Sequence, residues 1–566
     1  MISFNKCILK VSSMNTVIDK DYLKFKTYLN DWISEKYEQK NHKGKLVTVF
    51  CSYGDSHKRC QVWNTSDLDI HLVKKRLDNF LLKLIENYRK LPEFIKFDFV
   101  YNIEQIQWAD LKEEIAHQKH NNHYRKGISF DERFSICFLE QEIYAKAIIK
   151  GTVYNEPNFI DEKNLQDAIK SKYPKLDRKY DVCKIKKVYI FDTMGIFYEN
   201  GEFLDLISTG CGNGVRHIKK DKKKVVKELV LKNAEFLYQQ ILSDGRFVYG
   251  YFPAYNREIK SYNTVRHCTA LYALLETLEI ESNQKYLEKI KISIDYAIKS
   301  FYKDVDGKAF MIDGDELNQE IKLGSIAAAI FMLAKYQEIT GDKKYQQYSE
   351  KLANGILYML NNKGETVHVL NYPELTVKEK FRIVYYDGEA ALGLLRLYAL
   401  NQDLKLLETV KLMFKNFIEK QYDQYHDHWL SYCTNELTIY CPEEQYFRFG
   451  LDNYLNHMEF IRNRKTAYAT LLEMMMAAYK MVTRIKQKDL IDLYKQSKFE
   501  ELKKLIELRV DFQHETGFFY PEIAMYMANP KKILNSFYVR HDRFRTRIDD
   551  QEHNLSGYVA YLNFYE

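Results

Sequence analysis

The sequence predicts two parts of different fold class: an α+β domain of unknown role over residues 1–215, then an all-α domain of helical hairpins over 220–566. Three observations carry this prediction. The 566 residues contain only 8 Pro and 22 Gly beside 46% hydrophobic residues, which favours long regular elements. The apolar pattern changes from mixed to helical periods near Lys220, and a turn motif then recurs along the chain.

The first part mixes strand and helix patterns. Residues 47–51 and 96–100 read as strands, and residues 68–90 between them as an amphipathic helix. Further strands are predicted over 187–191 and 195–198. Asn200-Gly201 then supplies a turn that suits a β-hairpin.

The second part is organised around a repeated turn. An amphipathic segment is followed by an acidic or glycine turn and then by an aromatic or apolar residue, about five times in all. These turns lie at 244–247, 306–310, 363–367, 427–430 and 515–519. The first three are spaced by roughly 60 residues, which is enough for two helices and their loops.

Small-residue-rich helices lie between the turns, over 264–278, 323–336, 388–400 and 466–482. Aligning Tyr286 with Tyr345 also aligns Ala270 with Ala329, so the repeat holds its register through a hairpin. Ala and Gly permit close backbone approach, which suits inner helices. The segment 345–360 has a one-sided apolar stripe and reads as an outer helix.

Three stretches of the second part resemble the six-hairpin (α/α) toroid proteins. They are Leu-Gly-Ser-Ile-Ala-Ala-Ala-Ile-Phe-Met-Leu over 323–333, Thr-Gly-Asp over 340–342 followed by Tyr345, and Tyr-Asp-Gly-Glu-Ala-Ala-Leu-Gly-Leu-Leu over 386–395. That superfamily is known chiefly for glycoside hydrolases, polysaccharide lyases and sugar epimerases. The resemblance covers about 220–566 and implies a toroid with a central funnel. It does not identify a reaction, because the fold hosts many chemistries and also non-catalytic members.

The first part, over about 45–150, is similar to AMMECR1-like α/β domains in the order of its strands and helices. This similarity implies no function. Within it, the segment 123–142 interleaves aromatic and charged residues densely. We interpret this segment as a structural loop and helix that pack on the neighbouring domain.

The toroid resemblance implies that polar residues at the starts of the inner helices face the funnel, where helix N-termini favour acidic or hydroxyl-rich ligands. Tyr262, Asn263, Arg266 and His267 open the first of these helices. His267 could serve as a general base and Arg266 could hold a carboxylate. The alternative is a satisfied histidine at a helix end, with the arginine on the surface.

Asp387 and Glu389, preceded by Tyr386, open the third inner helix. Glycosidic bond hydrolysis needs one carboxyl group as acid and another as base or nucleophile. Residues two apart on a helix point in different directions, so a partner from another cluster would be needed. The alternative is an N-cap at Asp387, with Glu389 favoured by the helix dipole.

Two more clusters precede apolar helices. His457, Glu459, Arg462 and Arg464 indicate either a polar cavity or a surface charge network, and Arg547, Asp549 and His553 either close the funnel or cap the last hairpin. The catalytic candidates are therefore His267, Asp387, Glu389 and Glu459. The binding candidates are Tyr262, Asn263, Arg266, Tyr386, His457, Arg462, Arg464, Arg547, Asp549 and His553.

No cofactor or metal is expected. His426, His428, Cys433, Cys441 and His457 match no standard zinc spacing. The sequence also lacks GxxxxGK[ST], GxSxG and a GxGxxG after a strand, which argues against nucleotide-binding and serine-hydrolase functions.

Charge, cysteine content and the length of apolar runs argue against several kinds of binding partner. The 85 basic and 78 acidic residues are spread along the chain, which disfavours nucleic acid. The nine Cys are odd in number without CxxC spacing, which indicates reduced thiols, and no apolar run reaches membrane-spanning or signal-peptide length. We therefore expect no membrane association and a cytoplasmic location.

Two classes of function remain. The leading hypothesis is a carbohydrate-active enzyme, namely a hydrolase, lyase or epimerase acting on an oligosaccharide or capsule-type sugar, with a carbohydrate or other small polar ligand in the funnel. The alternative is a non-catalytic glycan-binding or assembly protein. A third reading, a peptide-modifying toroid enzyme, would require a metal site.

Overall fold

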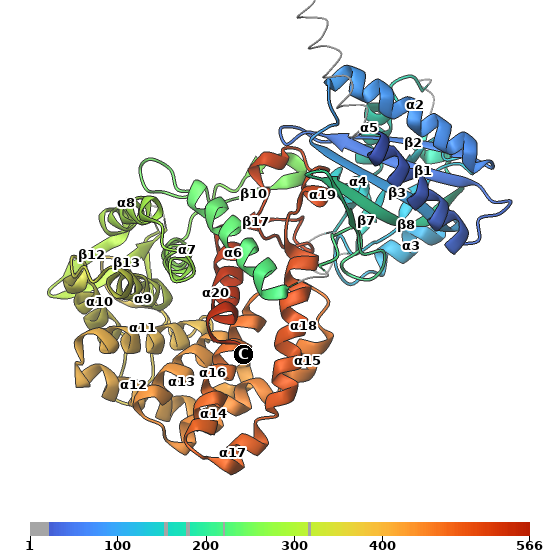
Figure 1. Ribbon diagram of the computed structural model, residues 1–566. Coiled ribbons are helices and arrows are strands. Elements are labelled where there is room, and N and C mark those ends of the chain that lie inside the picture. Colours follow the sequence, from blue (N-terminus) through green and yellow to red (C-terminus); the bar gives the residue numbers. More distant parts are fainter. Residues whose placement is uncertain (1–21, 152–156, 177–180, 219–220, 315–317) are drawn as a thin grey trace, which may run out of the picture.

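The computed structural model describes residues 22–151, 157–176, 181–218, 221–314 and 318–566. A sheet-containing part and a helical part lie side by side (Figure 1). The strands of the main sheet all come from residues before 206, and the helices of the second part begin at Lys222. One later segment, between residues 518 and 547, returns to the sheet.

The first part is built on a seven-stranded antiparallel sheet of order β2-β1-β3-β8-β4-β5, with β9 also paired to β8. Its strands are β1 (Val47–Gly54), β2 (Gln61–Asp67), β3 (Phe94–Gln107), β4 (Gly127–Ser129), β5 (Cys137–Phe138), β8 (Lys187–Glu199) and β9 (Glu202–Asp205). Its helices are 22–39, α2 (Ile70–Tyr88), α3 (Trp108–Ala116), α4 (Glu140–Ala145) and α5 (Glu162–Lys172). β6 (Ile149–Lys150) and β7 (Phe159–Ile160) form a separate pair.

Two sequence predictions concern the strands of this sheet. Asn200 and Gly201 have positive φ of 52° and 88° and join β8 to β9, so the predicted hairpin turn is confirmed. The two strands predicted over 187–191 and 195–198 are one strand, β8, because the extended backbone continues through Met194 and Gly195.

Both faces of the sheet are buried, and alternation along β1 and β3 assigns each residue to a face. Cys51 and Phe97 pack with the helix over 22–39 and with α2. On the other face Lys96 Nζ pairs with Asp98 at 2.8 Å, and its ammonium lies over the ring of Tyr526 from the second part. The sheet is therefore covered by helices on one side and by the returning segment on the other.

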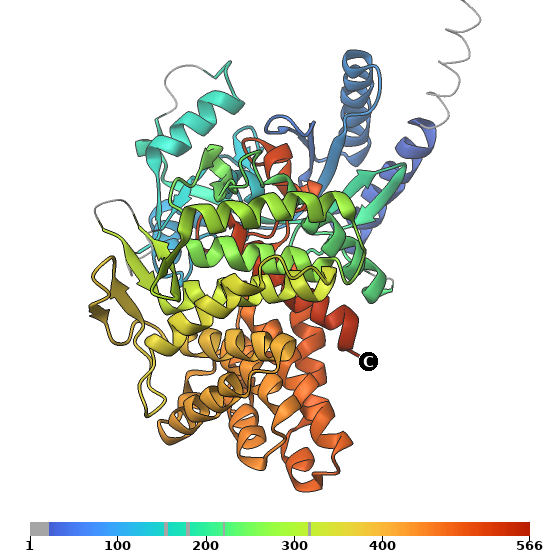
Figure 2. The ribbon, with the colours of Figure 1, turned by 90° about the vertical axis from the view of Figure 1, so that its left-hand side faces the viewer.

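In the described chain, six helices of the second part form a closed inner ring. They are α7 (Thr264–Thr277), α9 (Leu323–Thr340), α11 (Tyr385–Asn401), α13 (His428–Tyr440), α16 (Thr470–Gln487) and α20 (Ile548–Phe564). Each packs on the next in this order, and α20 packs back on α7. Figure 2 shows the hairpins following one another from green to red. This closed ring is that of an (α/α) toroid and confirms the architecture that the resemblance implied.

Outer helices cover the ring. They are α6 (Lys222–Gln239), α8 (Gln284–Phe301), α10 (Gln346–Tyr358), α12 (Leu404–Glu419), α14 (Glu444–Leu455) and α18 (Phe499–Gly517). Only five turns were visible in the sequence because the sixth hairpin pairs α6, the first helix, with α20, the last. Those two helices have no connecting turn. The turn predicted at 427–430 is instead the start of α13, where Asp427 is the N-cap and accepts the Leu430 amide at 2.9 Å.

Short strands and helices lie in the loops between the ring helices. β12 (Tyr302–Val305), β13 (Lys308–Asp313), β14 (Glu320–Lys322), β15 (Val369–Asn371) and β16 (Val377–Glu379) form one antiparallel sheet. β10 (Gly250–Phe252), β11 (Arg257–Glu258) and β17 (Thr546–Arg547) form another. The remaining helices are α15 (Met458–Asn463), α17 (Ile491–Gln496) and α19 (Pro521–Ala524).

A buried ionic network joins the two parts. Arg540 donates to Glu140 Oε1 at 2.8 Å and to the Asn122 carbonyl at 2.7 Å, and Arg125 donates to the same Glu140 oxygen at 2.6 Å. The largest hydrophobic cluster also runs across the boundary, so the two parts do not have fully separate cores. The segment 123–142 thus packs on the helical part, in the way its composition predicted.

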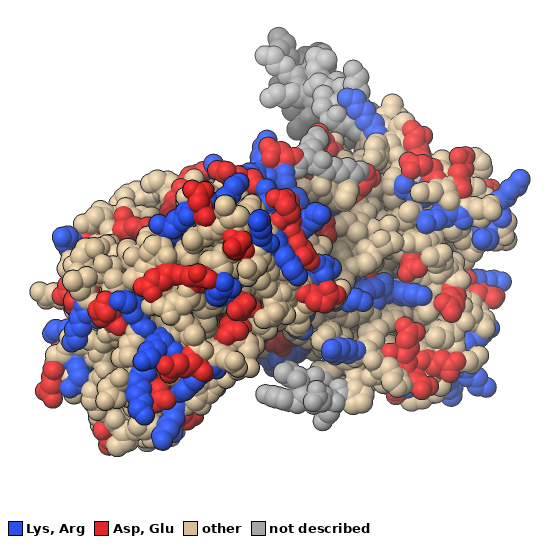
Figure 3. All heavy atoms as spheres, turned by 90° about the horizontal axis from the view of Figure 1, so that it is seen from below, with Lys and Arg blue, Asp and Glu red and all other residues tan. Residues whose placement is uncertain are grey.

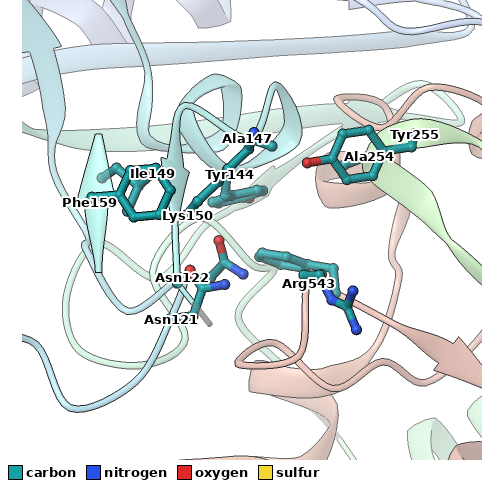
Figure 4. A pocket seen from close by; sticks show the side chains of 12 residues that line it. Asn121, Asn122, Tyr144, Ala147, Ile149, Lys150, Phe159, Ala254, Tyr255 and Arg543 are labelled. Atoms are coloured by element: carbon teal, nitrogen blue, oxygen red, sulfur yellow. The ribbon is translucent and has the colours of Figure 1, made fainter. Parts of the chain in front are cut away.

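A cavity of about 180 Å³ opens at the same boundary. Figure 4 shows Ile149 and Phe159 on one side of it and Tyr255 and Arg543 on the other. The lining is mainly apolar. Its two cations are already paired, Lys150 with Asp161 and Arg543 with Asp542.

The surface carries both signs of charge. On the face seen from below, acidic and basic side chains are interspersed (Figure 3). Among the described helices, none is long and apolar enough to cross a membrane. The eight cysteines of the described residues are all unpaired.

Candidate active site

A cavity of about 320 Å³ lies where the first turns of α7, α11, α13, α16 and α20 converge. The toroid gathers these helix starts on one rim, so residues distant in sequence meet there. The lining residues are Asn263, Val265, Arg266, Thr269, Ile383, Tyr385, Tyr386, Glu389, His428, Trp429, Thr470, Asp549, Glu552 and His553.

His553 on α20 is held by a carboxylate from the neighbouring helix α16. Its Nδ1 donates to Glu473 Oε2 at 2.9 Å, and Glu473 Oε1 accepts the Tyr432 hydroxyl at 3.1 Å. Burial would lower the pKa of His553, but the carboxylates of Glu552 and Glu473 raise it to about 10. His553 is therefore an imidazolium at neutral pH, and its Nε2–H is the group available to a ligand.

His428 on α13 also lies beside a carboxylate. Its Nδ1 lies 3.1 Å from Oδ1 of Asp427, the residue that caps the same helix. The other ring nitrogen of His428 is Nε2. Within the described residues this buried Nε2 has no hydrogen-bond partner. The ring centroids of His428 and His553 are 5.2 Å apart, so the two imidazoles share the cavity floor.

Two buried carboxyl groups, Glu389 and Glu552, lie beside the imidazoles. Burial, reinforced by Asp427 and Glu552, raises the pKa of Glu389 well above its usual range. Burial likewise raises the pKa of Glu552 to about 8. Glu389 Oε2 has no hydrogen-bond partner in the part of the chain that is described, and it lies against Gly324 of α9. A Cβ at position 324 would come within 2.1 Å of it, so the close approach requires glycine.

Arg266 supplies a fixed cation at the cavity wall. Its Nε donates to Asp549 Oδ2 at 2.8 Å and its Nη1 to the Tyr249 hydroxyl at 2.8 Å. Arg547 also bonds Asp549. Burial would raise the pKa of Asp549, but Arg547 and Arg266 hold it well below its usual range. Asp549 is therefore ionised and doubly paired, and it positions the arginines.

The cavity combines a proton donor, a proton acceptor and a guanidinium, which is an arrangement suited to general acid–base chemistry. One group of residues could also hold a metal ion, because ligand atoms of His428, Glu473 and His553 lie within 4.8 Å of one another. The absence of a metal remains a prediction.

The structure brings together only some of the residues that the sequence singled out. Six of these candidates line the cavity, namely Asn263, Arg266, Tyr386, Glu389, Asp549 and His553. Arg547 does not line it but forms a hydrogen bond with Asp549, which does. Of the four catalytic candidates, Glu389 lines the cavity and His267, Asp387 and Glu459 do not. His267 and Asp387 lie elsewhere, because each successive residue of a helix is turned by about 100°. His457, Glu459 and Arg464 lie elsewhere because they belong to α15 and its two ends and not to the first turn of α16.

His267 and Asp387 point away from the ring axis. His267 is fully buried, Tyr262 bonds its Nδ1 at 2.8 Å, and its Nε2 contacts the Ser293 carbonyl at 3.1 Å on outer helix α8. Asp387 accepts His368 Nε2 at 2.9 Å and thereby fixes the loop before β15. For His267 this is the satisfied, structural placement that the sequence left open as an alternative. Asp387 is not the N-cap of α11, because that helix begins at Tyr385 after Val384.

The third cluster divides between rim and surface. Glu459 is 75% exposed at its side chain and pairs with Arg462, which also pairs with Glu501. His457 stacks on His426 with ring centroids 4.6 Å apart. The Arg464 guanidinium lies over the rings of Phe460 and Tyr468. The surface charge network is the placement found for Glu459 and Arg462.

Sequence reasoning missed His428, Trp429, Glu473 and Glu552. Asp427-His-Trp was read as a turn, although Asp before an apolar segment with helical spacing at Leu430, Cys433 and Leu437 is an N-cap signal. Glu473 is a lone acid in the Met-rich stretch Leu-Leu-Glu-Met-Met-Met, and a buried acid of that kind is a pointer to function.

Comparison with known proteins gives structural similarities only. No protein-family model matches the chain, and no curated protein matches it. Several solved structures have a similar chain path over about 60% of this chain. They include a D-mannose isomerase, with 13% identity and a TM-score of 0.46 over 61% of this chain and 99% of that one.

Two further similar structures are carbohydrate enzymes. A cellobiose 2-epimerase from Bacillus thermoamylovorans has 12% identity and a TM-score of 0.45 over 60% of this chain and 99% of that one. An unsaturated glucuronyl hydrolase specific for heparin has 11% identity and a TM-score of 0.42, over 60% and 97% of the two chains.

Proposed function

We propose that this protein is a sugar isomerase or epimerase that moves a proton at the carbon next to a carbonyl group. The observation that carries the proposal is the pair of imidazoles, His428 and His553, that line the cavity with ring centroids 5.2 Å apart. His553 is charged and His428 presents a free Nε2, so one is suited to give a proton and the other to take one.

The chemistry follows from these roles. His428 Nε2 removes the proton from the carbon beside the carbonyl of an open-chain sugar, while His553 Nε2–H protonates the carbonyl oxygen. The product is an enediol. Proton return to the former carbonyl carbon, with loss of the hydroxyl proton on the neighbouring carbon, gives the isomer. Proton return to the original carbon from the opposite face, with loss of the proton from the former carbonyl oxygen, gives the epimer. Arg266 is placed to hold the oxygen atoms on which charge develops.

Glycoside hydrolysis is the second candidate, and one observation favours it. Burial raises the pKa of Glu389 while the neighbouring arginines lower the pKa of Asp549, and a glycosidase uses such a separation between its acid and its base. However, Asp549 is clamped by Arg266 and Arg547, which weakens it as a base or nucleophile. Proton transfer by the histidines therefore ranks first, and sugar binding without catalysis ranks after both.

Hydrogen exchange tests the proposal directly. The purified protein is incubated in D₂O with D-mannose, with cellobiose and with a panel of other aldoses and ketoses, and the proton beside the carbonyl is followed by NMR. We expect its signal to be lost, and we expect His428→Asn and His553→Asn each to slow exchange by roughly 10²- to 10⁴-fold. Glu459→Gln, which changes an exposed side chain, is the control.

Two outcomes would overturn the proposal. One is no exchange with any sugar of the panel, and the other is exchange that survives in both histidine variants. New reducing ends from an oligosaccharide, lost on Glu389→Gln but kept in the histidine variants, would establish hydrolysis instead.

A further inference from the structure

A second group of polar side chains lies at the funnel rim and comes from both parts of the chain. The loop between α3 and β4 contributes His120 and His123, and the ring domain contributes Arg464 and His541. The ring centroid of His120 is 5.5 Å from that of His123 and 5.9 Å from that of His541. We call these four residues the rim cluster.

The rim cluster adjoins the cavity. Arg464 lies just before α16 and His541 just before α20, and the first turns of both helices line the cavity at Thr470 and Asp549. The Arg464 guanidinium is centred 5.1 Å from the ring of Tyr468, which neighbours the cavity-lining Tyr385. A ligand that extends out of the cavity would therefore reach the cluster.

The cluster has donors without acceptors. Nε2 of His123, Nδ1 of His541 and Nε of Arg464 are buried atoms with no hydrogen-bond partner in the described chain. Over the same residues Arg464 forms no ion pair, whereas nearby Arg462 pairs with two glutamates. Buried donors without partners are costly, and a bound acceptor would satisfy them.

The charges around the cluster favour an anion. Arg540 and Arg125 lie beside His123 and share one acidic partner, Glu140. Lys119 lies beside His120. Arg545 lies beside His541 and is paired with Asp542 and Asp550. Burial, then the nearby Arg540, lowers the pKa of His123 to about 3, and burial with His120 and Arg464 lowers that of His541 to about 4. These rings are neutral at physiological pH, and each offers one N–H in a positive field.

The backbone that carries the cluster is fixed. The Asn122 side-chain amide donates to the Arg540 carbonyl at 3.0 Å, and the Arg540 side chain donates back to the Asn122 carbonyl. The histidines flanking these two positions are thereby held in register across the domain boundary. This gives the first part of the chain a role at the funnel.

From this geometry we infer that the rim cluster binds an oxyanion, namely a carboxylate, sulfate or phosphate group carried by the sugar that occupies the funnel. The inference deepens the proposed function and names its substrate class as an acidic sugar. Arg464 supplies a full positive charge and the histidines supply directed N–H groups. A neutral sugar would leave these donors unpaired.

Calorimetric titration of the full-length protein tests this inference. The probes are D-glucuronate, glucose 6-phosphate and inorganic sulfate, with D-glucose as the neutral comparison. We expect the preferred anionic sugar to bind at least tenfold more tightly than D-glucose. We expect Arg464→Gln and, separately, His120→Asn to reduce that preference at least tenfold, while Arg462→Gln, the same substitution two residues away, leaves it unchanged.

The three anionic probes distinguish the possible sources of the anion. Preference for glucuronate indicates a uronic acid, and preference for glucose 6-phosphate indicates a sugar phosphate. Binding of sulfate alone, or an anion preference that persists in both rim variants, would overturn the inference. Hydrogen exchange on a neutral sugar reports on the proposed function separately, because Arg464→Gln leaves His428 and His553 in place. If the protein prefers anionic sugars but catalyses no hydrogen exchange, only the proposed function is contradicted. If it catalyses exchange but shows no anion preference, only this inference is contradicted.

Discussion

Glu473 accepts the Nδ1–H of His553 at 2.9 Å from a helix that lies far from it in sequence, and Glu473 is itself fully buried. This contact sets both the orientation of the imidazole and its charge. It joins the two helices, α16 and α20, that bring the ring towards closure.

The substitution Glu473→Gln should lower the pKa of His553. The amide keeps the size of the side chain and its contact with Tyr432 but removes a buried negative charge that stabilises the imidazolium. The alkaline limb of the pH–rate profile for proton exchange should therefore move down by about one pH unit or more. A limb that stays in place would show that Glu473 does not set the charge of His553, and Glu459→Gln is the exposed control.

Gly324→Ala should disturb the cavity without touching it directly. The new methyl would meet Glu389 Oε2 at 2.1 Å and Tyr386 Cδ1 at 2.6 Å, so both side chains must move. We expect a loss of about 1–3 kcal/mol in unfolding free energy, together with weaker sugar binding. Gly393→Ala on α11, whose nearest contact would be at 3.3 Å, should cost less in chemical denaturation. Equal costs for the two variants would argue against the close packing.

Acidification should destabilise the ring through His267. Burial lowers the pKa of His267 from 6.5 to about 4. Between these pH values the imidazole binds a proton in the unfolded state and stays neutral in the folded state. Its contribution is present above pH 6.5 and is lost as pH falls towards 4, amounting to roughly 3 kcal/mol. Denaturation curves of His267→Phe should show a smaller loss of stability over this range than the wild type. If the unfolding free energy of His267→Phe fell with pH as steeply as that of the wild type, the lowered pKa of His267 would be contradicted.

Arg540→Met should weaken the contact between the two parts. The substitution removes one of the two arginines that pair with Glu140 in the described chain, and it removes the donor to the Asn122 carbonyl. Breaking a buried ion pair costs roughly 3–5 kcal/mol. Chemical denaturation and hydrogen exchange in the loop 117–126 would detect this. Arg543→Met, at a more exposed position in the same loop, is the control and should change stability by less than about 1 kcal/mol.

The ring itself was visible in the sequence at the level of local pattern. The small-residue helices at 264–278, 323–336 and 388–400 correspond to α7, α9 and α11, because alanine-rich inner helices leave a strong local signature. The sixth hairpin left none. It pairs the first and last helices, α6 and α20, and no local motif connects segments so far apart.

The candidate site was predictable only in part, for a related reason. A helix start can be recognised from sequence, and Arg266, Glu389, Asp549 and His553 were found in that way. Which side chain of a helix start faces the axis depends on the rotation of the helix. His267 is adjacent to Arg266 and points outward to Ser293.

The sequence by itself determined the fold class of the second part and the rim on which polar residues gather, because periodicity and residue size act locally. Only the tertiary structure decided that His428, Glu473 and His553 meet. Their contact depends on the packing of α13, α16 and α20 side by side, and it is this shared burial that gives His553 its charge.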